Sequence, residues 1–151
     1  MQFDENSSSV KDSKSLMEFP VFADPRQPEV HASTLVLTGK SLLCAWFGGT
    51  KEGHADTKIW MSQFDLSNLD AAWTKSYPVA SENGLAHWNP VFFKDSSSGS
   101  LLLFYKVGSP ISSWCTKIIV SNDDGATWSK SCEFVPGDRG EQHSSISTRG
   151  F

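Results

Sequence analysis

The sequence of 151 residues lacks a long hydrophobic run. No stretch reaches the roughly 18 uninterrupted apolar residues that a membrane-spanning helix requires. Residues 1–6 carry two acidic side chains, whereas a secretory leader begins with basic residues followed by apolar ones. We therefore expect a cytoplasmic protein that does not enter the membrane.

Positive charge and cysteine are also scarce. Lysine and arginine number 13 against 17 acidic residues, and only three of the 13 are arginines, so a basic face for nucleic acid is not expected. Cys44, Cys115 and Cys132 are an odd set with no C-x-x-C pair, so the sequence suggests neither a disulfide framework nor a four-ligand zinc site. His and Asp do not cluster at metal-binding spacings, so we expect neither a metal nor a cofactor.

Aromatic residues and short apolar runs are abundant. Six tryptophans lie among runs of Val, Leu, Ile and Phe, which Gly, Pro, Asn and Ser separate. No stretch keeps a 3.6-residue apolar period for three turns, so the pattern predicts an all-β fold. Residues 1–18 are rich in Ser, Lys, Asp and Glu and predict a flexible N-terminal arm, which leaves residues 19–151 for the folded domain.

The strand pattern repeats along the chain. His31 and His87, each beginning an apolar strand, lie 56 residues apart, and residues 42–46 align with residues 101–105. Each unit predicts four short strands, which is typical of a β-propeller blade. We expect one blade over residues 29–80, another over 86–136, and the start of a third over 137–151. Two blades cannot close a ring, so open blade edges predict self-association.

The motif S-x-D-x-G-x-T-W follows an apolar strand in the second unit. It consists of Ser121, Asp123, Gly125, Thr127 and Trp128. The carboxylate can accept hydrogen bonds from backbone amides of a tight turn, glycine permits a positive φ, and the indole fills the space beneath. We interpret these five residues as a structural turn, not as a catalytic group.

This motif resembles the Asp box, or BNR repeat, of the sialidase superfamily. The resemblance implies a sialidase-type β-propeller, six-bladed in full, whose members act on or bind glycans. A carbohydrate ligand and a glycoside-hydrolase-like parent enzyme are therefore implied. Residues 30–33 hold no arginine where true sialidases place one to bind the sialic acid carboxylate, so sialic acid itself is not the expected substrate.

Candidate site residues lie where blade ends converge. Asp56 roughly matches the family's acid/base aspartate, and Glu52 supplies a second carboxylate in the same loop. His31 and His87 are expected to line the pocket, because imidazole moves protons near neutral pH. The alternative for each histidine is a polar plug satisfied by backbone carbonyls. The alternative for both carboxylates is a solvated loop charge.

Two other functions remain open. In a uronate polysaccharide lyase, His31, His54 and Tyr105 would supply acid and base, while Lys117 would neutralise the substrate carboxylate. In a non-catalytic glycan- or protein-binding propeller, Trp88 could stack on a sugar ring, although packing between blades also explains it. Without further blades, we expect this chain alone to be catalytically inactive.

Overall fold

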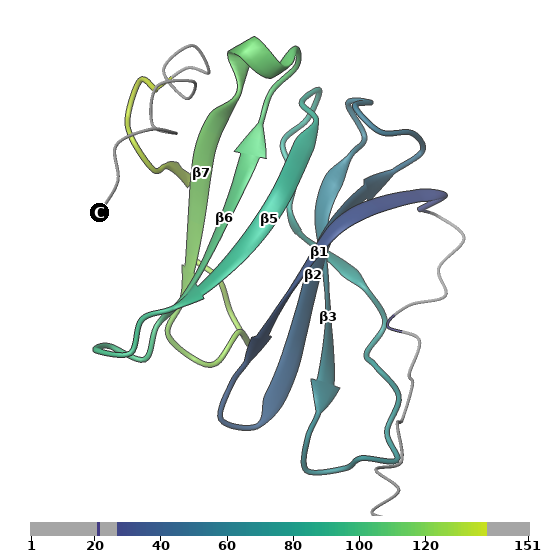
Figure 1. The fold of residues 1–151 in the computed structure, drawn as a ribbon, viewed down its shortest axis with the longest axis vertical. Helices are drawn as coiled ribbons and strands as arrows, with labels where there is room; N and C mark the ends of the chain where they lie inside the picture. Colours follow the sequence, from purple (N-terminus) through teal and green to yellow (C-terminus); the bar gives the residue numbers. More distant parts are fainter. Residues whose placement is uncertain (1–20, 22–26, 139–151) are drawn as a thin grey trace, which may run out of the picture.

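The computed structural model describes residue 21 and residues 27–138. The predicted N-terminal arm and nearly all of the predicted third-blade segment, including His143, lie outside these residues. Within them the chain forms two four-stranded antiparallel sheets (Figure 1). The prediction of an all-β fold with two four-stranded units is confirmed. The described residues do not form a closed propeller.

The strands follow one another in space in the order in which they occur along the chain. The first sheet contains β1 (Glu29–Leu37), β2 (Ser41–Gly49), β3 (Lys58–Asp65) and β4 (Tyr77–Ala80). The second sheet contains β5 (His87–Lys94), β6 (Leu101–Val107), β7 (Cys115–Ser121) and β8 (Cys132–Glu133). One 3₁₀ turn, η1 (Ile111–Ser113), precedes β7. In the described part of the chain, no helix is long and apolar enough to cross a membrane.

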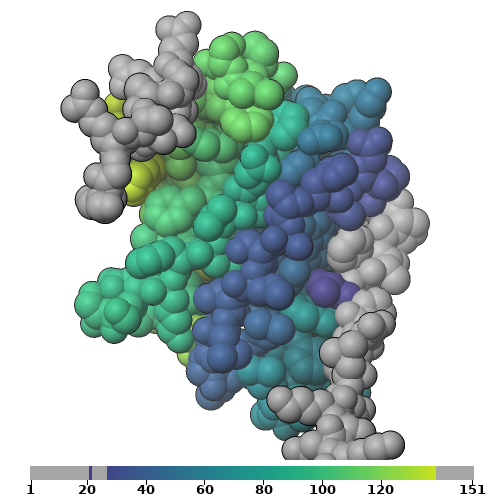
Figure 2. Space-filling model, viewed as in Figure 1, coloured from purple at the N-terminus to yellow at the C-terminus, as the bar shows by residue number. Residues whose placement is uncertain are grey.

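The two sheets pack face to face around one hydrophobic core. The first sheet contributes Ala45, Phe47 and Met61, and the second sheet contributes Leu103 and Tyr105. These side chains alternate along their strands with residues that point away from the partner sheet, as the period of two requires. In the space-filling view, β1 and β5 lie directly against each other (Figure 2).

The first strand of each sheet contains a β-bulge, and the two bulges show which residues of the sheets correspond. The pairing register shifts between His31 and Thr34 in β1, and between Trp88 and Val91 in β5. A residue with positive φ lies within each shift, Ala32 at 50° and Asn89 at 45°. These bulges are 57 residues apart, so Trp88 is the structural counterpart of His31.

The predicted equivalence of His31 and His87, at 56 residues, is therefore wrong by one position. The paired strands make Val30, not His31, the counterpart of His87. A shift of one residue moves a side chain to the other face of a strand. The two histidines consequently occupy different environments.

The loops fall at two opposite ends of the sheets. The β2–β3 loop, the β4–β5 linker and the β6–β7 loop share one end, which we call the loop end (Figure 1, top). The turns between β1 and β2, β5 and β6, and β7 and β8 lie at the other end, the turn end. Most of the predicted site residues belong to the loop end, and the S-x-D-x-G-x-T-W motif belongs to the turn end.

Candidate functional site

The β2–β3 loop is held in shape by its own hydrogen bonds. The backbone N–H of Thr50 donates to Asp56 Oδ2 at 3.1 Å, and the N–H of Thr57 donates to the carbonyl of His54 at 2.9 Å. Gly53 has φ of 82°, and a Cβ there would lie 3.2 Å from the Trp88 ring. The glycine thus lets the loop rest on the second sheet.

Asp56 is an ionised carboxylate within this loop. Desolvation raises its pKa, but hydrogen bonds from Thr50 and the nearby His54 outweigh it and leave the pKa below its ordinary value. A general acid of a glycosidase needs the opposite shift, because it must stay protonated near neutral pH. In this arrangement Asp56 organises the loop and can accept hydrogen bonds.

Glu52 and His31 face each other across the junction of the loop and β1. His31 Nε2 lies 4.0 Å from Glu52 Oε2, and the two side chains are 48% and 52% exposed. The backbone N–H of Glu52 donates to Glu29 Oε2 at 2.6 Å, which fastens the loop to the start of β1. The sequence did not point to Glu29 as a site residue. Only its position at the beginning of the first strand could have indicated this role.

His54 completes this group of polar side chains. It is exposed, and its Nδ1 lies 3.5 Å from Thr50 Oγ1. The structure therefore brings four of the predicted residues, with Glu29, to one edge of the loop end. We call this set the loop rim: Glu29, His31, Glu52, His54 and Asp56.

His87 lies inside the protein, away from the loop rim. It is 0% exposed, and its Nδ1 lies 3.1 Å from the carbonyl oxygen of Thr57 and 3.0 Å from that of Leu85. Two carbonyl acceptors require that Nδ1 carry the proton. Burial lowers the pKa of His87 and outweighs the opposing effect of these carbonyls. This geometry matches the alternative of a polar plug held by backbone carbonyls.

Trp88 links the two sheets. Its ring centroid lies 5.6 Å from that of Phe47 in the first sheet and 5.1 Å from that of Trp114. Its Nε1 donates to the carbonyl of Gly108 at 2.9 Å. With Gly53 against the same ring, Trp88 packs between the two sheets, and its side chain is partly buried, which leaves little of the ring for a sugar to stack on.

Tyr105 and Lys117 are not brought together with the loop rim. Tyr105 is buried in the intersheet core, donates to Ser131 Oγ at 2.7 Å, and has a pKa raised by desolvation to about 12. Lys117 Nζ forms an ion pair with Glu82 at 2.6 Å. Of the four residues predicted for a uronate lyase, His31 and His54 therefore lie on the loop rim. Tyr105 and Lys117 do not.

The S-x-D-x-G-x-T-W segment forms one hydrogen-bonded turn. Ser121 Oγ donates to Asp123 Oδ1 at 2.7 Å, the N–H of Thr127 donates to the same oxygen at 2.9 Å, and the N–H of Gly125 donates to Ser121 Oγ at 2.9 Å. Hydrogen bonds from Thr127, then Ser121, lower the pKa of Asp123 to about 2. Trp128 packs against the intersheet core, and its ring lies 6.2 Å from that of Phe92.

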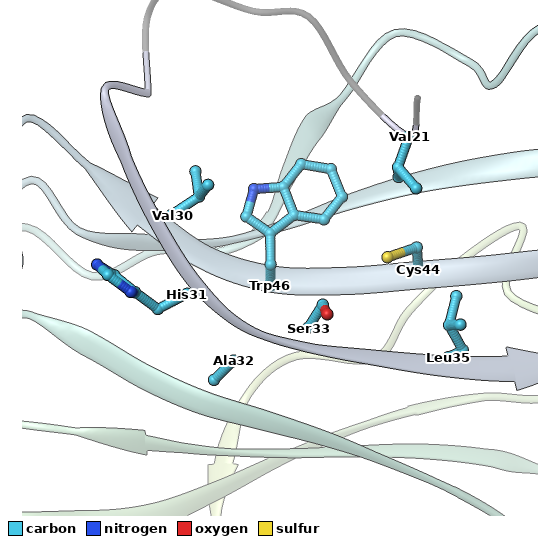
Figure 3. A pocket seen from close by; sticks show the side chains of 8 residues that line it. All are labelled: Val21, Val30, His31, Ala32, Ser33, Leu35, Cys44 and Trp46. Carbon is cyan, nitrogen blue, oxygen red and sulfur yellow. The ribbon is translucent and has the colours of Figure 1, made fainter. Parts of the chain in front are cut away.

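A mostly apolar hollow opens on the face of the first sheet that points away from the second sheet. It encloses about 380 Å³ (Figure 3). The lining residues are Val21, Val30, His31, Ala32, Ser33, Leu35, Cys44 and Trp46. Nothing in the sequence reasoning pointed to this hollow. Among the described residues, no group of three or more His, Cys, Asp or Glu could hold a metal ion.

Comparison with known families agrees with this architecture. A model of the BNR repeat-like domain matches residues 40–147, which is well over half of the chain. The chain therefore belongs to the BNR repeat-like family, in agreement with the resemblance to sialidase-type repeats. No curated protein matches the sequence.

Proposed function

We propose that the loop rim binds a carbohydrate, and that a neutral glycan fits it better than an anionic one. The observation that carries this proposal is the convergence of polar side chains from β1 and the β2–β3 loop at one exposed edge, with His31 and Glu52 facing each other at 4.0 Å. Family membership supports it, because BNR repeats of the sialidase type serve glycan-directed proteins.

The chemistry of the rim suits sugar hydroxyls. The Glu52 carboxylate can accept from two hydroxyls, and the imidazole of His31 can donate to or accept from a third. The side chain of Glu29 is already engaged by the Glu52 N–H, so the loop is ordered before a ligand arrives. The three carboxylates of the rim outnumber the positive charge of the neighbouring Lys51, so the rim is acidic. This charge disfavours the binding of anionic sugars such as uronates and sialic acid.

Binding is supported better than hydrolysis by the described residues. A glycosidase needs one carboxyl whose pKa is raised, but the pKa of Asp56 is lowered by its bonds from Thr50. A uronate lyase is supported less, since Tyr105 is buried and Lys117 is paired with Glu82.

Affinity measurements on rim variants test this proposal. The 151-residue chain is screened against immobilised neutral, amino-sugar and uronate oligosaccharides, and the best-bound neutral oligosaccharide is titrated by calorimetry. We expect His31→Ala and Glu52→Gln each to weaken binding about tenfold, which corresponds to the loss of one or two hydrogen bonds.

Asp70→Asn is the matched control, since Asp70 is an exposed carboxylate in the β3–β4 connection at the turn end. It should leave the affinity unchanged. Equal binding by the control and both rim variants, or preference for uronates over neutral sugars, would contradict the proposal.

A further inference from the structure

The linker between β4 and β5 carries an asparagine–glycine pair in an exposed turn. Asn83 and Gly84 are both exposed to solvent, and their linker lies at the loop end (Figure 1). One backbone hydrogen bond closes the turn, in which the N–H of Leu85 donates to the carbonyl of Glu82 at 3.3 Å. This length exceeds the usual range of about 2.7–3.2 Å, so the turn is weakly closed and can open.

Neither member of the pair is restrained by its surroundings. The side-chain amide of Asn83 and the backbone N–H of Gly84 make no hydrogen bond to any described residue. Gly84 has φ of 77°, and a Cβ built on it would meet no heavy atom within 4 Å apart from its chain neighbours. The backbone nitrogen of Gly84 therefore has no side chain beside it, and there is open space around the turn.

Asparagine is a thermolabile residue, and this arrangement favours attack of the Gly84 nitrogen on the side-chain amide of Asn83. The nitrogen loses its proton and bonds to Cγ, the C–N bond of the side-chain amide breaks, and ammonia leaves. The product is a succinimide ring. Water, the only co-reactant, then opens the ring at either carbonyl. One opening gives aspartate, and the other gives isoaspartate, in which the main chain runs through Cβ and Cγ.

The other asparagines of the described residues are less suited to this reaction. Asn68 and Asn122 each accept a hydrogen bond on the side-chain oxygen, which holds the side chain in place. Leucine follows the first and aspartate the second, and their side chains hinder approach of the backbone nitrogen. Asn89 precedes Pro90, which has no N–H to lose. Asn83 is therefore expected to react first.

We propose that Asn83 is a site of spontaneous deamidation, and that its isoaspartate form loosens the β4–β5 linker. The new carboxylate lies next to Glu82 in the chain, whose Oε1 pairs with Lys117 Nζ at 2.6 Å. Isoaspartate also lengthens the main chain by one atom within the turn. Beyond the turn, the Leu85 carbonyl lies 3.0 Å from His87 Nδ1, so a displaced linker disturbs the contacts of this buried histidine.

Peptide-level mass spectrometry of aged protein tests this proposal. The full chain is incubated at mildly alkaline pH and digested at acidic pH, and fragmentation distinguishes aspartate from isoaspartate. We expect both forms to accumulate at position 83, several-fold faster than at Asn68 or Asn122 in the same sample. Gly84→Ala should slow the reaction at Asn83 several-fold, because the added methyl group hinders the attacking nitrogen. Asn83→Gln should remove the signal at this position.

Urea unfolding measures the consequence for the linker. The isoaspartate fraction, separated by ion exchange, should be less stable than fresh protein. Asn83→Asp adds the charge without lengthening the main chain and should lose less stability. Circular dichroism verifies that Gly84→Ala is folded, and Gly84→Asp replaces it if it is not, since aspartate tolerates a positive φ.

Four results would overturn the proposal. They are an Asn83 that stays unmodified, reaction at Asn68 or Asn122 as fast as at Asn83, a folded Gly84 variant that reacts at the wild-type rate, and isoaspartate protein as stable as fresh protein.

Discussion

At the scale of single residues, His87 shows how burial separates a structural histidine from a functional one. Its ring lies against Tyr105, with centroids 5.8 Å apart, and its Nδ1 contacts two carbonyls. Its Nε2 is buried and has no hydrogen-bond partner among the described residues. Such an atom tolerates a lone pair better than a proton with its positive charge. His31, by contrast, is 48% exposed and faces Glu52 at the surface.

Acid should therefore destabilise the protein through His87. Burial holds the pKa of His87 below its ordinary value, so only the unfolded chain gains the proton readily. The associated stability is present above about pH 6.5 and is lost as the pH falls through the folded-state pKa. Glu82 opposes this shift in pKa, and Lys117 adds to it. Urea unfolding between pH 7.5 and 5 measures the loss.

The conservative variant His87→Gln separates this effect from general acid sensitivity. It should be less stable at pH 7.5 but should lose less stability on acidification than the wild type. His54→Gln, at an exposed position, is the control and should follow the wild-type profile. Identical pH profiles for His87→Gln and the wild type would show that His87 is not the titrating group.

At the scale of elements, the β7–β8 turn is defined by a glycine that serves both conformation and packing. Gly125 has φ of 89°, and a Cβ on it would overlap the side chain of Leu43 in the first sheet. The turn therefore reaches across the intersheet boundary. The hydrogen bonds of Ser121 and Asp123 fix its shape, and the contact with Leu43 fixes its place.

Gly125→Ala should destabilise the protein by about 2–4 kcal/mol, since backbone strain of about 1–3 kcal/mol is joined by the displacement of a buried leucine. Gly99→Ala is the matched control. Gly99 has φ of 75°, but nothing lies within 4 Å of a Cβ there. The control should therefore lose only the strain component. Equal losses in urea unfolding of the two variants would show that the turn does not depend on the Leu43 contact.

The elements themselves could be predicted from sequence better than their register. Alternating apolar residues and turn residues identified the strands, and the motif at residues 121–128 identified its turn. The bulges at Ala32 and Asn89 left no clear signal, because neither residue is a glycine. Matching His31 to His87 by identity therefore gave 56 residues where the pairing gives 57.

Site residues within one loop were predictable, whereas those that depend on packing were not. Glu52, His54 and Asp56 share a short segment, so their proximity follows from the sequence. Tyr105 and Lys117 are on neighbouring strands, but their burial and partners depend on how the second sheet packs. The hollow on the face of the first sheet that points away from the second sheet likewise forms only once the strands are paired.

At the scale of the whole molecule, the described residues of this BNR repeat-like chain form two four-stranded sheets that pack face to face. The intersheet contact places the β2–β3 loop of the first sheet against Trp88 of the second. The second sheet therefore supports the loop rim, which belongs to the first sheet.

An NMR titration shows directly whether the loop rim binds a neutral glycan. The ¹⁵N-labelled 151-residue chain is titrated with the neutral oligosaccharide that it binds best in the screen. We expect the amide shifts to change for residues 29–31 and 50–57, while those of the turn end at residues 95–100 and 122–127 stay constant. Shift changes confined to the turn end, or none at millimolar sugar, would contradict it.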